Sequence, residues 1–279
     1  MQNKTLCMSI SPSYGIPLDE QIRLLRKTGF NGFFTGWKRG ADMALCRKVA
    51  DECGMIIQSV HAPFGGCADM WYDDVDEAEK FISELCECVD ACVSAGVDLM
   101  ISHAFIGFDD DVTVPNDMGL YRYGRVIDYA AERGVKIAFE NTEGEEFLAA
   151  LLKEFGSRKN VGYCWDSGHE MCYNGSKDLL ALYGDKLLGT HINDNLGVND
   201  PNGVITWRDD LHLLPLDGIA DWQYNMQRLK KCGFGGPLTF ELNKQSKPER
   251  HDNDKYDAMP VEQYFAEAYA RVCRIAKFF

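Results

Sequence analysis

Short apolar runs alternate along this chain with longer segments in which apolar residues recur every three or four positions. The short runs predict β-strands that are buried on both faces, and the longer segments predict amphipathic helices. The expected strands are 6–10, 30–35, 55–60, 97–102, 135–139, 161–165, 186–190 and 238–240. The expected helices are 18–28, 41–53, 74–94, 120–133, 145–155, 176–183, 221–231 and 261–277. Gly29, Gly54 and Gly134 follow three of these helices directly, where a glycine commonly ends a helix.

Eight strand–helix units in succession predict an α/β fold of the (β/α)₈ TIM barrel type. A doubly wound sheet is the alternative, but it does not need eight units, and no glycine-rich phosphate loop follows the first expected strand. The chain has 279 residues, 46% of them hydrophobic, which suits one barrel with a sizeable core. Residues 244–257 are polar and predict a long loop after the last strand. We therefore expect residues 1–279 to form a single domain.

Potential metal ligands stand at the ends of six consecutive expected strands. In chain order they are His61, His103, Glu140, Asp166, His191 and Glu241, and the long loop before the last strand adds Asp210 and His212. In a parallel barrel all C-terminal strand ends lie on one face, so these side chains should meet there. Converging carboxylates repel one another unless a cation lies between them. Taken singly, each residue could instead be a hydrogen-bonded histidine, a surface glutamate or an aspartate held by backbone amides, but their conjunction predicts a divalent metal site.

Composition narrows the function classes. The formal net charge of −14 disfavours binding to nucleic acid. No apolar segment is long enough to cross a bilayer, and the apolar run after Met1–Lys4 is too short for a signal peptide, so we expect a cytoplasmic protein without a membrane partner. The eleven cysteines include no C-x-x-C pair and are expected to be free, buried hydrophobes. Cys67 and Cys172 follow histidine motifs, but no adjacent base supports a role as nucleophile. His251 is expected to be a solvated surface residue.

The motifs themselves resemble a known family. They are His61-Ala-Pro63, Phe139-Glu140-Asn141, Asp166-Ser-Gly-His169, His191-Ile-Asn-Asp194, Asp210-Leu-His212 with Pro215 and Gly218, and Phe240-Glu241. Their order and spacing resemble the xylose isomerase-like TIM barrel superfamily. That group contains sugar and sugar-phosphate isomerases and epimerases, and also the abasic-site nucleases of the endonuclease IV type. The resemblance covers nearly the whole chain.

This resemblance implies a set of metal ligands. In the ketose epimerases one divalent ion is held by residues that correspond to Glu140, Asp166, His191 and Glu241. In the nuclease branch, residues corresponding to His61, His103, His169, Asp210 and His212 complete a three-zinc cluster, which leaves Asp210 and His212 open as additional ligands here. Mostly oxygen ligands favour Mn²⁺ or Mg²⁺, with Zn²⁺ as the alternative.

The expected function is therefore that of a metal-dependent isomerase or epimerase of a sugar, sugar phosphate or sugar-like polyol. Glu140 and Glu241 would remove and return a proton through an enediolate. A zinc-dependent abasic-site nuclease, a dehydratase on the same site and a non-catalytic sugar-binding barrel remain alternatives. The sequence leaves the metal, the sugar, the reaction subtype and assembly into a homo-oligomer open.

Side chains around the site predict a small-molecule sugar as the binding partner. His61, His103 and His169 should contact the substrate. Aromatic walls that suit a sugar ring are expected from Trp37, Phe64, Trp71, Phe105, Trp165 and Trp207. Lys38, Arg39 or Arg208 could hold an anionic group of the substrate. The acidic run 109–111, in the loop after the fourth expected strand, is unfavourable for a polyanion.

Overall fold

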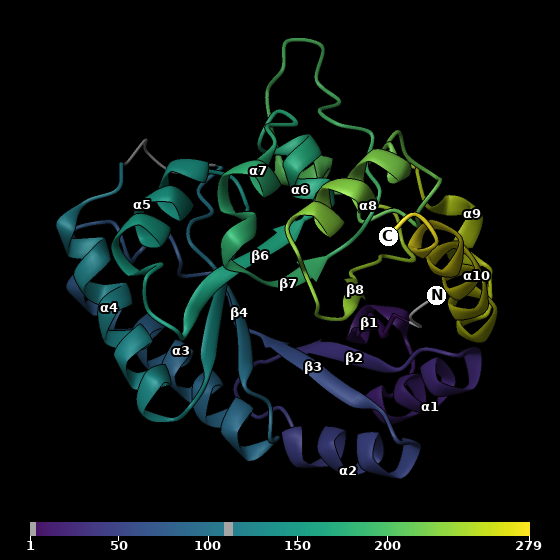
Figure 1. Ribbon diagram of the computed structural model, residues 1–279, viewed down its shortest axis with the longest axis horizontal. Coiled ribbons are helices and arrows are strands. Elements are labelled where there is room, and N and C mark those ends of the chain that lie inside the picture. The colour runs from purple at the N-terminus through teal and green to yellow at the C-terminus, as the bar shows by residue number, and fades with distance from the viewer. Residues whose placement is uncertain (1–3, 109–113) are drawn as a thin grey trace.

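A computed structural model describes residues 4–108 and 114–279 (Figure 1). Its eight parallel strands neighbour one another in the order β7-β6-β5-β4-β3-β2-β1-β8. The strands are β1 Leu6–Ile10, β2 Gly32–Gly36, β3 Ile56–His61, β4 Leu99–His103, β5 Lys136–Glu140, β6 Val161–Asp166, β7 Leu187–His191 and β8 Leu238–Phe240. The two ends of the sheet meet at a parallel bridge between Ile192 and Phe240. The result is a nearly closed barrel, which confirms the predicted (β/α)₈ fold.

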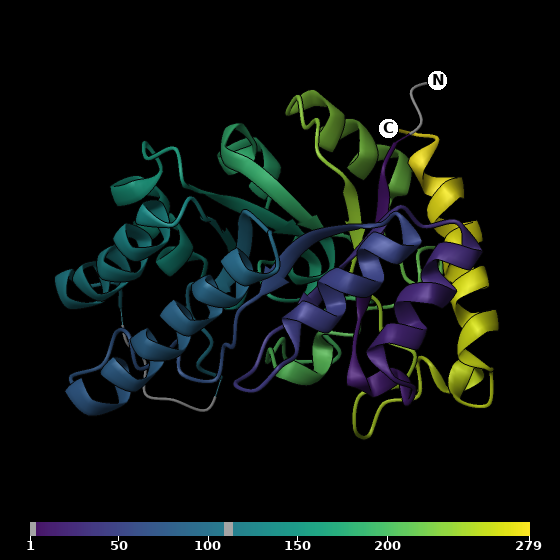
Figure 2. The same ribbon diagram turned by 90° about the horizontal axis from the view of Figure 1, so that it is seen from below.

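Helices surround the strands on all sides (Figures 1 and 2). They are α1 Leu18–Thr28, α2 Met43–Cys53, α3 Val75–Ser94, α4 Asp117–Glu132, α5 Glu145–Phe155, α6 Ser167–Cys172, α7 Leu179–Tyr183, α8 Trp222–Lys231, α9 Asp254–Asp257 and α10 Val261–Ala276. The last helix, α10, packs beside α1, where Lys27 Nζ lies 2.6 Å from Glu262 Oε1. The first and last described residues also lie close together, since Lys4 Nζ is 3.9 Å from the centre of the Phe279 ring, and Figure 2 shows β1 beside α10. None of these helices is long and apolar enough to cross a bilayer.

Apolar side chains form an inner and an outer layer of core. Leu99, Ile101, Ala138 and Cys164 cluster on neighbouring strands, with Leu188 packed against them. A much larger cluster contains the apolar faces of the helices together with the remaining strand residues. Strands that face both layers must be apolar on both sides, which is why they appear in the sequence as continuous apolar runs.

The expected elements agree with the structure except at a few places. Six strands end one residue later than expected, and the last residues of five of them are His61, His103, Glu140, Asp166 and His191. The helix expected at 176–183 is shorter, and helices α6 and α9 were not expected. The α6 helix begins because the Asp166 carboxylate accepts a hydrogen bond from the N–H of His169 and caps it. The pair Ser167-Gly168 normally indicates a turn, so the sequence did not predict a helix beginning there.

The eleven cysteines are free, as expected. Burial raises the pKa of the Cys67 thiol to about 12 and that of Cys172 well above its usual value. A buried thiol that stays protonated is a poor nucleophile, so neither cysteine is placed for covalent catalysis.

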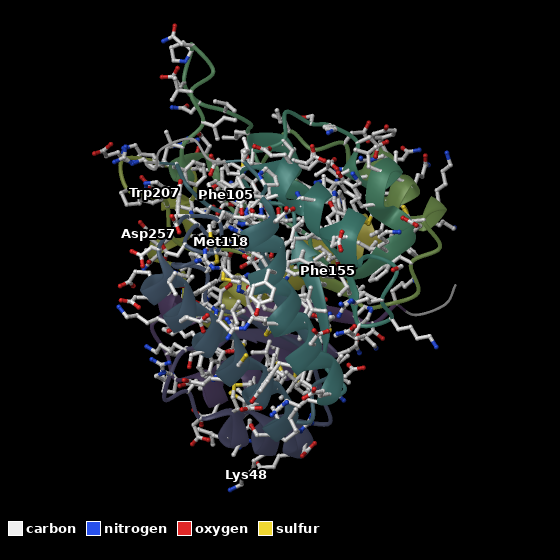
Figure 3. All side chains as sticks on the ribbon, turned by 90° about the vertical axis from the view of Figure 1, so that its left-hand side faces the viewer. Lys48, Phe105, Met118, Phe155, Trp207 and Asp257 are labelled. Carbon is white, nitrogen blue, oxygen red and sulfur yellow. The ribbon has the colours of Figure 1, made fainter. Side chains whose placement is uncertain are left out.

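Two glycines of α4 provide a matched test of packing. A Cβ added at Gly119 would overlap the indole of Trp71, whose exposed fraction is 1%. At Gly124 the nearest atom is Phe155 Cζ at 3.3 Å, on a ring in the helical layer (Figure 3). Alanine gains about 1 kcal/mol of helix propensity at either site, but overpacking costs about 1–3 kcal/mol.

Gly119→Ala should therefore lower the free energy of unfolding by up to about 2 kcal/mol, whereas Gly124→Ala should leave it unchanged or raise it slightly. Urea denaturation followed by circular dichroism measures both. Equal effects of the two substitutions would show that the Trp71 side chain can shift without loss of stability, and would contradict the packing argument.

Candidate functional site

The C-terminal strand ends bring carboxylates and imidazoles into one buried group. Ligand atoms of Glu140, Asp166, His191 and Glu241 all lie within 4.8 Å of one another. Glu140 ends β5, Asp166 ends β6, His191 ends β7, and Glu241 follows β8 directly. These are the four residues for which the sequence predicts a shared divalent metal.

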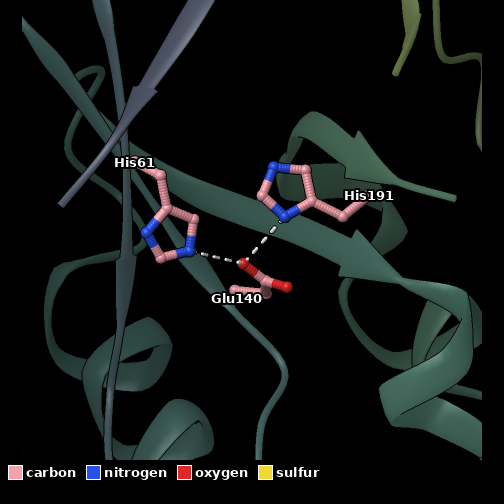
Figure 4. A group of neighbouring side chains, drawn as sticks. All are labelled: His61, Glu140 and His191. Atoms are coloured by element: carbon pink, nitrogen blue, oxygen red, sulfur yellow. Dashed lines mark ion pairs between the residues drawn. The ribbon is translucent and has the colours of Figure 1, made fainter. Parts of the chain in front are cut away.

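Glu140 occupies the centre of this group. Its Oε2 lies 3.0 Å from His191 Nδ1 and 3.5 Å from His61 Nε2 (Figure 4). Its Oε1 lies 3.3 Å from His169 Nδ1. Despite this proximity, neither carboxylate oxygen has a hydrogen-bond partner among the described residues, and the same holds for both ring nitrogens of His191. Buried polar atoms are rarely left unpaired, and a convergence of carboxylate and imidazole atoms of this kind fits a bound cation.

Asp166 is held in place by two amides. Its Oδ1 accepts the N–H of His169 at 2.7 Å, and its Oδ2 accepts Asn193 Nδ2 at 2.8 Å. Burial raises the pKa of this carboxyl to about 7, with the His169 imidazole opposing and the nearby Glu140 carboxylate reinforcing the shift. Amide groups therefore do hold the Asp166 carboxylate, which was the alternative to a role as metal ligand. Because each oxygen can accept a second interaction, this does not conflict with a role as ligand.

The two glutamates stay ionised for an electrostatic reason. Burial raises the pKa of Glu140, but the imidazoles of His191, His103 and His169 outweigh it and hold the pKa well below its usual value. For Glu241 the same competition, with His191 and His212 as the main opposing groups, lowers the pKa to about 2. Glu241 Oε2 also lies 3.0 Å from His191 Nδ1. Both carboxylates are therefore available as ligands or bases at neutral pH.

Two further groups adjoin the first one. His169, Asp210 and His212 form one of them, with 3.2 Å between His169 Nε2 and Asp210 Oδ1 and 2.8 Å between His212 Nε2 and Asp210 Oδ2. His61, Glu140 and His191 form the other. His103 lies beside them with its ring stacked on Phe64, and burial lowers its pKa to about 4, so that it is neutral.

Amide side chains behind the ligands had no role assigned from the sequence. Asn141 accepts the N–H of Asp166 and the O–H of Tyr163, and it donates to the Asp166 carbonyl. The carbonyl of Asn141 also lies 2.9 Å from His169 Nδ1. Asn193 contacts the Asp166 carboxylate as described above. Asn141 follows the predicted ligand Glu140 by one residue, and Asn193 follows His191 by two. This proximity was the sequence signal that could have indicated their supporting role.

Members of all three ligand groups, among them Glu140, Asp210 and Glu241, line a cavity of about 970 Å³, whereas the fully buried Asp166 and His191 are not among its lining residues. Of the aromatic residues expected around it, Trp37, Phe64 and Trp207 line the cavity, and Trp207, labelled in Figure 3, is 42% exposed. The expectation was wrong for three others, which pack elsewhere. Trp71 and Phe105 contact Phe147, and Trp165 donates its indole N–H to Glu170. Aromatic lining that the sequence did not single out comes from Phe34, Phe108 and Tyr173.

Of the three cationic residues expected at the site, only one lines the cavity among the described residues. Lys38 lines the cavity, but Arg39 pairs with Glu87 at 2.7 Å. Arg208 pairs with Glu249 at 3.4 Å and is not among the described lining residues. Lys247, which the sequence did not single out, lines the cavity and lies 3.3 Å from Asp210 Oδ2. The acidic run 109–111 lies outside the described residues. His251 is exposed, as expected.

A family model described as xylose isomerase-like TIM barrel matches residues 22–260. The chain belongs to this family. The match confirms the resemblance drawn from the strand-end motifs, and it spans the strands from β2 to β8 and every ligand group described above.

Individual proteins also resemble this chain over most of its length. A Sinorhizobium fredii protein, described as uncharacterized protein y4fM, is 28% identical over 92% of this chain and 89% of its own length. Among solved structures, the IolI protein with a bound zinc atom has a TM-score of 0.74 at 19% identity, with 99% of each chain covered. The 3-keto-D-glucoside 4-epimerase YcjR from E. coli has a TM-score of 0.72 at 14% identity, over 98% of this chain and 100% of its own.

A xylose isomerase-like TIM barrel/4-hydroxyphenylpyruvate dioxygenase fusion protein has a TM-score of 0.75 at 18% identity. The match covers 98% of this chain and 42% of the fusion protein. At these identities the solved structures show a shared fold.

Metal binding should stabilise this family member measurably. At a free Mn²⁺ concentration about 100 times its Kd, binding to the folded state contributes about 2.7 kcal/mol, which corresponds to a rise in Tm of roughly 5–10 °C over EDTA-treated protein. His191→Ala removes the imidazole shared by two ligand groups and should abolish most of this rise. His251→Ala changes a histidine whose side chain is 85% exposed and should keep it. A full Mn²⁺-induced rise in the His191→Ala variant would contradict the assigned site.

Proposed function

We propose that this chain is a divalent-metal-dependent isomerase or epimerase of a sugar, sugar phosphate or sugar-like polyol. The observation that carries the proposal is the placement of two ionised carboxylates, Glu140 and Glu241, each with an oxygen 3.0 Å from the same His191 nitrogen. They come from β5 and from the end of β8, so they approach the cavity floor from different sides of the barrel. The sugar epimerases among the structural neighbours support this class.

Glu140, Asp166, His191 and Glu241 would hold the metal ion. Three carboxylates and one imidazole favour Mn²⁺ or Mg²⁺, and the zinc atom in the IolI structure supports Zn²⁺ as the alternative. A divalent cation at this place supplies stabilisation of the negative charge that develops on a substrate oxygen.

Proton transfer is assigned to the two glutamates. One carboxylate removes a proton from the carbon next to the substrate carbonyl, which gives an enediolate, and the other returns a proton. Return to the opposite face of the same carbon inverts its configuration, whereas return to the neighbouring carbon moves the carbonyl. His103, neutral because of its burial, together with His61 and His169 lines the cavity beside the glutamates and can position substrate hydroxyls.

Exchange of carbon-bound hydrogen tests this assignment. A panel of ketoses and inosose-type cyclitols is incubated in D₂O with the Mn²⁺-loaded protein and followed by NMR, which also detects the dehydrated product of a dehydratase. Glu140→Gln and Glu241→Gln should each slow exchange by about 10²–10⁴-fold, the usual contribution of a general base. Glu154→Gln, on the exposed surface of α5, is the matched control. Metal content and circular dichroism are recorded for each variant. Exchange within about tenfold of the unsubstituted protein in both site variants would exclude these bases.

One observation favours a second candidate, the zinc-dependent abasic-site nuclease. Three ligand groups lie side by side, as the resemblance to the nuclease branch implies. A net charge of −14 opposes it, because affinity for nucleic acid depends on cations placed at phosphates. Elemental analysis and an abasic-site oligonucleotide decide between the two. We expect one metal ion per chain and no cleavage; three zinc ions together with cleavage would establish the nuclease instead.

A further inference from the structure

The cavity extends well beyond the ligand groups into an apolar side region between α1 and α2. We call this region the apolar annex. It is lined by Ile10, Pro12, Leu18, Ile22, Met43 and Leu45. The first turns of both helices form its wall, since α1 starts at Leu18 and α2 at Met43. Most of these side chains are at least partly shielded, but Leu45 is 43% exposed. An apolar wall open to the cavity loses contact with water when a ligand covers it.

The annex connects directly to the reaction centre. The ring of Phe34 lines the cavity and stacks on the His191 imidazole, with 4.4 Å between ring centroids and 16° between planes. Trp37, three residues after Phe34, lines the same cavity. A ligand held at Glu140 and Glu241 can therefore extend past Phe34 to the annex without leaving the cavity.

Polar groups of the annex are already used within the protein. The Asp42 carboxylate accepts the N–H of Leu45 and caps α2. Ser9 Oγ accepts the N–H of Leu242, and Ser11 Oγ accepts the N–H of Ser13. Hydroxyl groups of a sugar need free donors and acceptors when they leave water, whereas an apolar group does not. The annex thus suits the apolar part of a ligand.

The cavity volume agrees with a ligand larger than a free sugar. A hexose has about twelve non-hydrogen atoms and fills on the order of 200 Å³, if two such atoms take about the 30 Å³ of one water. The cavity has about 970 Å³. A volume of this size lies at the upper end of the range for drug-sized ligands.

We propose that the substrate is a sugar that carries an apolar, aromatic-sized substituent, and that the apolar annex binds this substituent. The inference rests on the proposed function for the reacting end, which must keep a carbonyl next to a hydroxyl at Glu140 and Glu241. The substituent is then linked through oxygen to another carbon of the sugar. A free monosaccharide would leave the annex wall exposed to water.

Binding of matched glycosides tests the proposal. Methyl and phenyl β-glycosides of glucose, galactose and mannose, each oxidised to the 3-ketone so that a carbonyl remains next to a hydroxyl, are titrated calorimetrically into the Mn²⁺-loaded protein. For at least one sugar the phenyl glycoside should bind about tenfold to a hundredfold more tightly than the methyl glycoside, as expected from burial of a ring. Equal affinities for all three pairs, or no binding of any phenyl glycoside at millimolar concentration, would overturn the proposal.

Variants locate the binding of the ring. Leu45→Glu makes the annex polar, and Ala41→Phe fills it from a half-buried lining position. Each should reduce the phenyl preference to about threefold or less and leave methyl glycoside affinity within about twofold. Leu182→Glu changes a leucine on α7 that is 49% exposed and should keep the full preference. An unchanged preference in both annex variants would place the ring elsewhere and overturn the proposal.

The hydrogen-exchange assay separates the two proposals. If sugars exchange and Glu140→Gln blocks exchange, but no phenyl preference exists, only the annex assignment fails. If the phenyl preference depends on Leu45 and Ala41, but no sugar exchanges, only the catalytic assignment fails.

Discussion

Three carboxylates held within 4.8 Å of one another at the end of a barrel impose the constraint on which this site depends. Like charges repel strongly in a poorly hydrated environment, and burying a single ionised group without a partner costs several kcal/mol. Glu140 illustrates the difficulty most clearly, because its exposed fraction is 0% and neither oxygen has a hydrogen-bond partner among the described residues. Positive charge must come from protonated imidazoles or from a metal ion. The surrounding side chains allow either source.

The barrel meets this constraint through strand register. His103 pairs with Glu140 across β4 and β5, and Asp166 pairs with His191 across β6 and β7. Paired residues of neighbouring parallel strands project in the same direction, so each of these two pairs brings a carboxylate beside an imidazole at the mouth. Behind them Asn141 joins Asp166 to Tyr163 through three hydrogen bonds. Such supporting hydrogen bonds fix ligand orientation, and they leave the lone pairs of Glu140 directed toward the cavity.

Much of this arrangement was accessible from the sequence. A strand buried on both faces is an apolar run, and a polar residue that closes such a run marks the strand end, which is why Glu140 and Asp166 could be placed. The α6 helix could not be predicted, because its start depends on a cap by Asp166 rather than on helix propensity. Side chains alternate along a strand, so Trp165, directly before Asp166, faces the opposite side of β6. The expectation that it lies at the mouth did not take this into account, and the residue is buried beside Glu170. Asn141 has no pattern beyond its position after Glu140.

The number of metal ions depends on charges around the second ligand group. Lys247 Nζ lies 3.3 Å from Asp210 Oδ2, and His212 Nε2 lies 2.8 Å from the same oxygen. Burial raises the pKa of Asp210, but His212, His169 and Lys247 together hold it well below its usual value. The second group thus has one carboxylate beside two imidazoles and Lys247, whereas the first has three carboxylates and one imidazole. A cation gains most where charge is least compensated, so the first group should bind its metal ion in preference to the second. The apolar annex lies outside the ligand motifs, and its apolar side chains offer no cation to a phosphate, unlike a surface built to bind a polyanion.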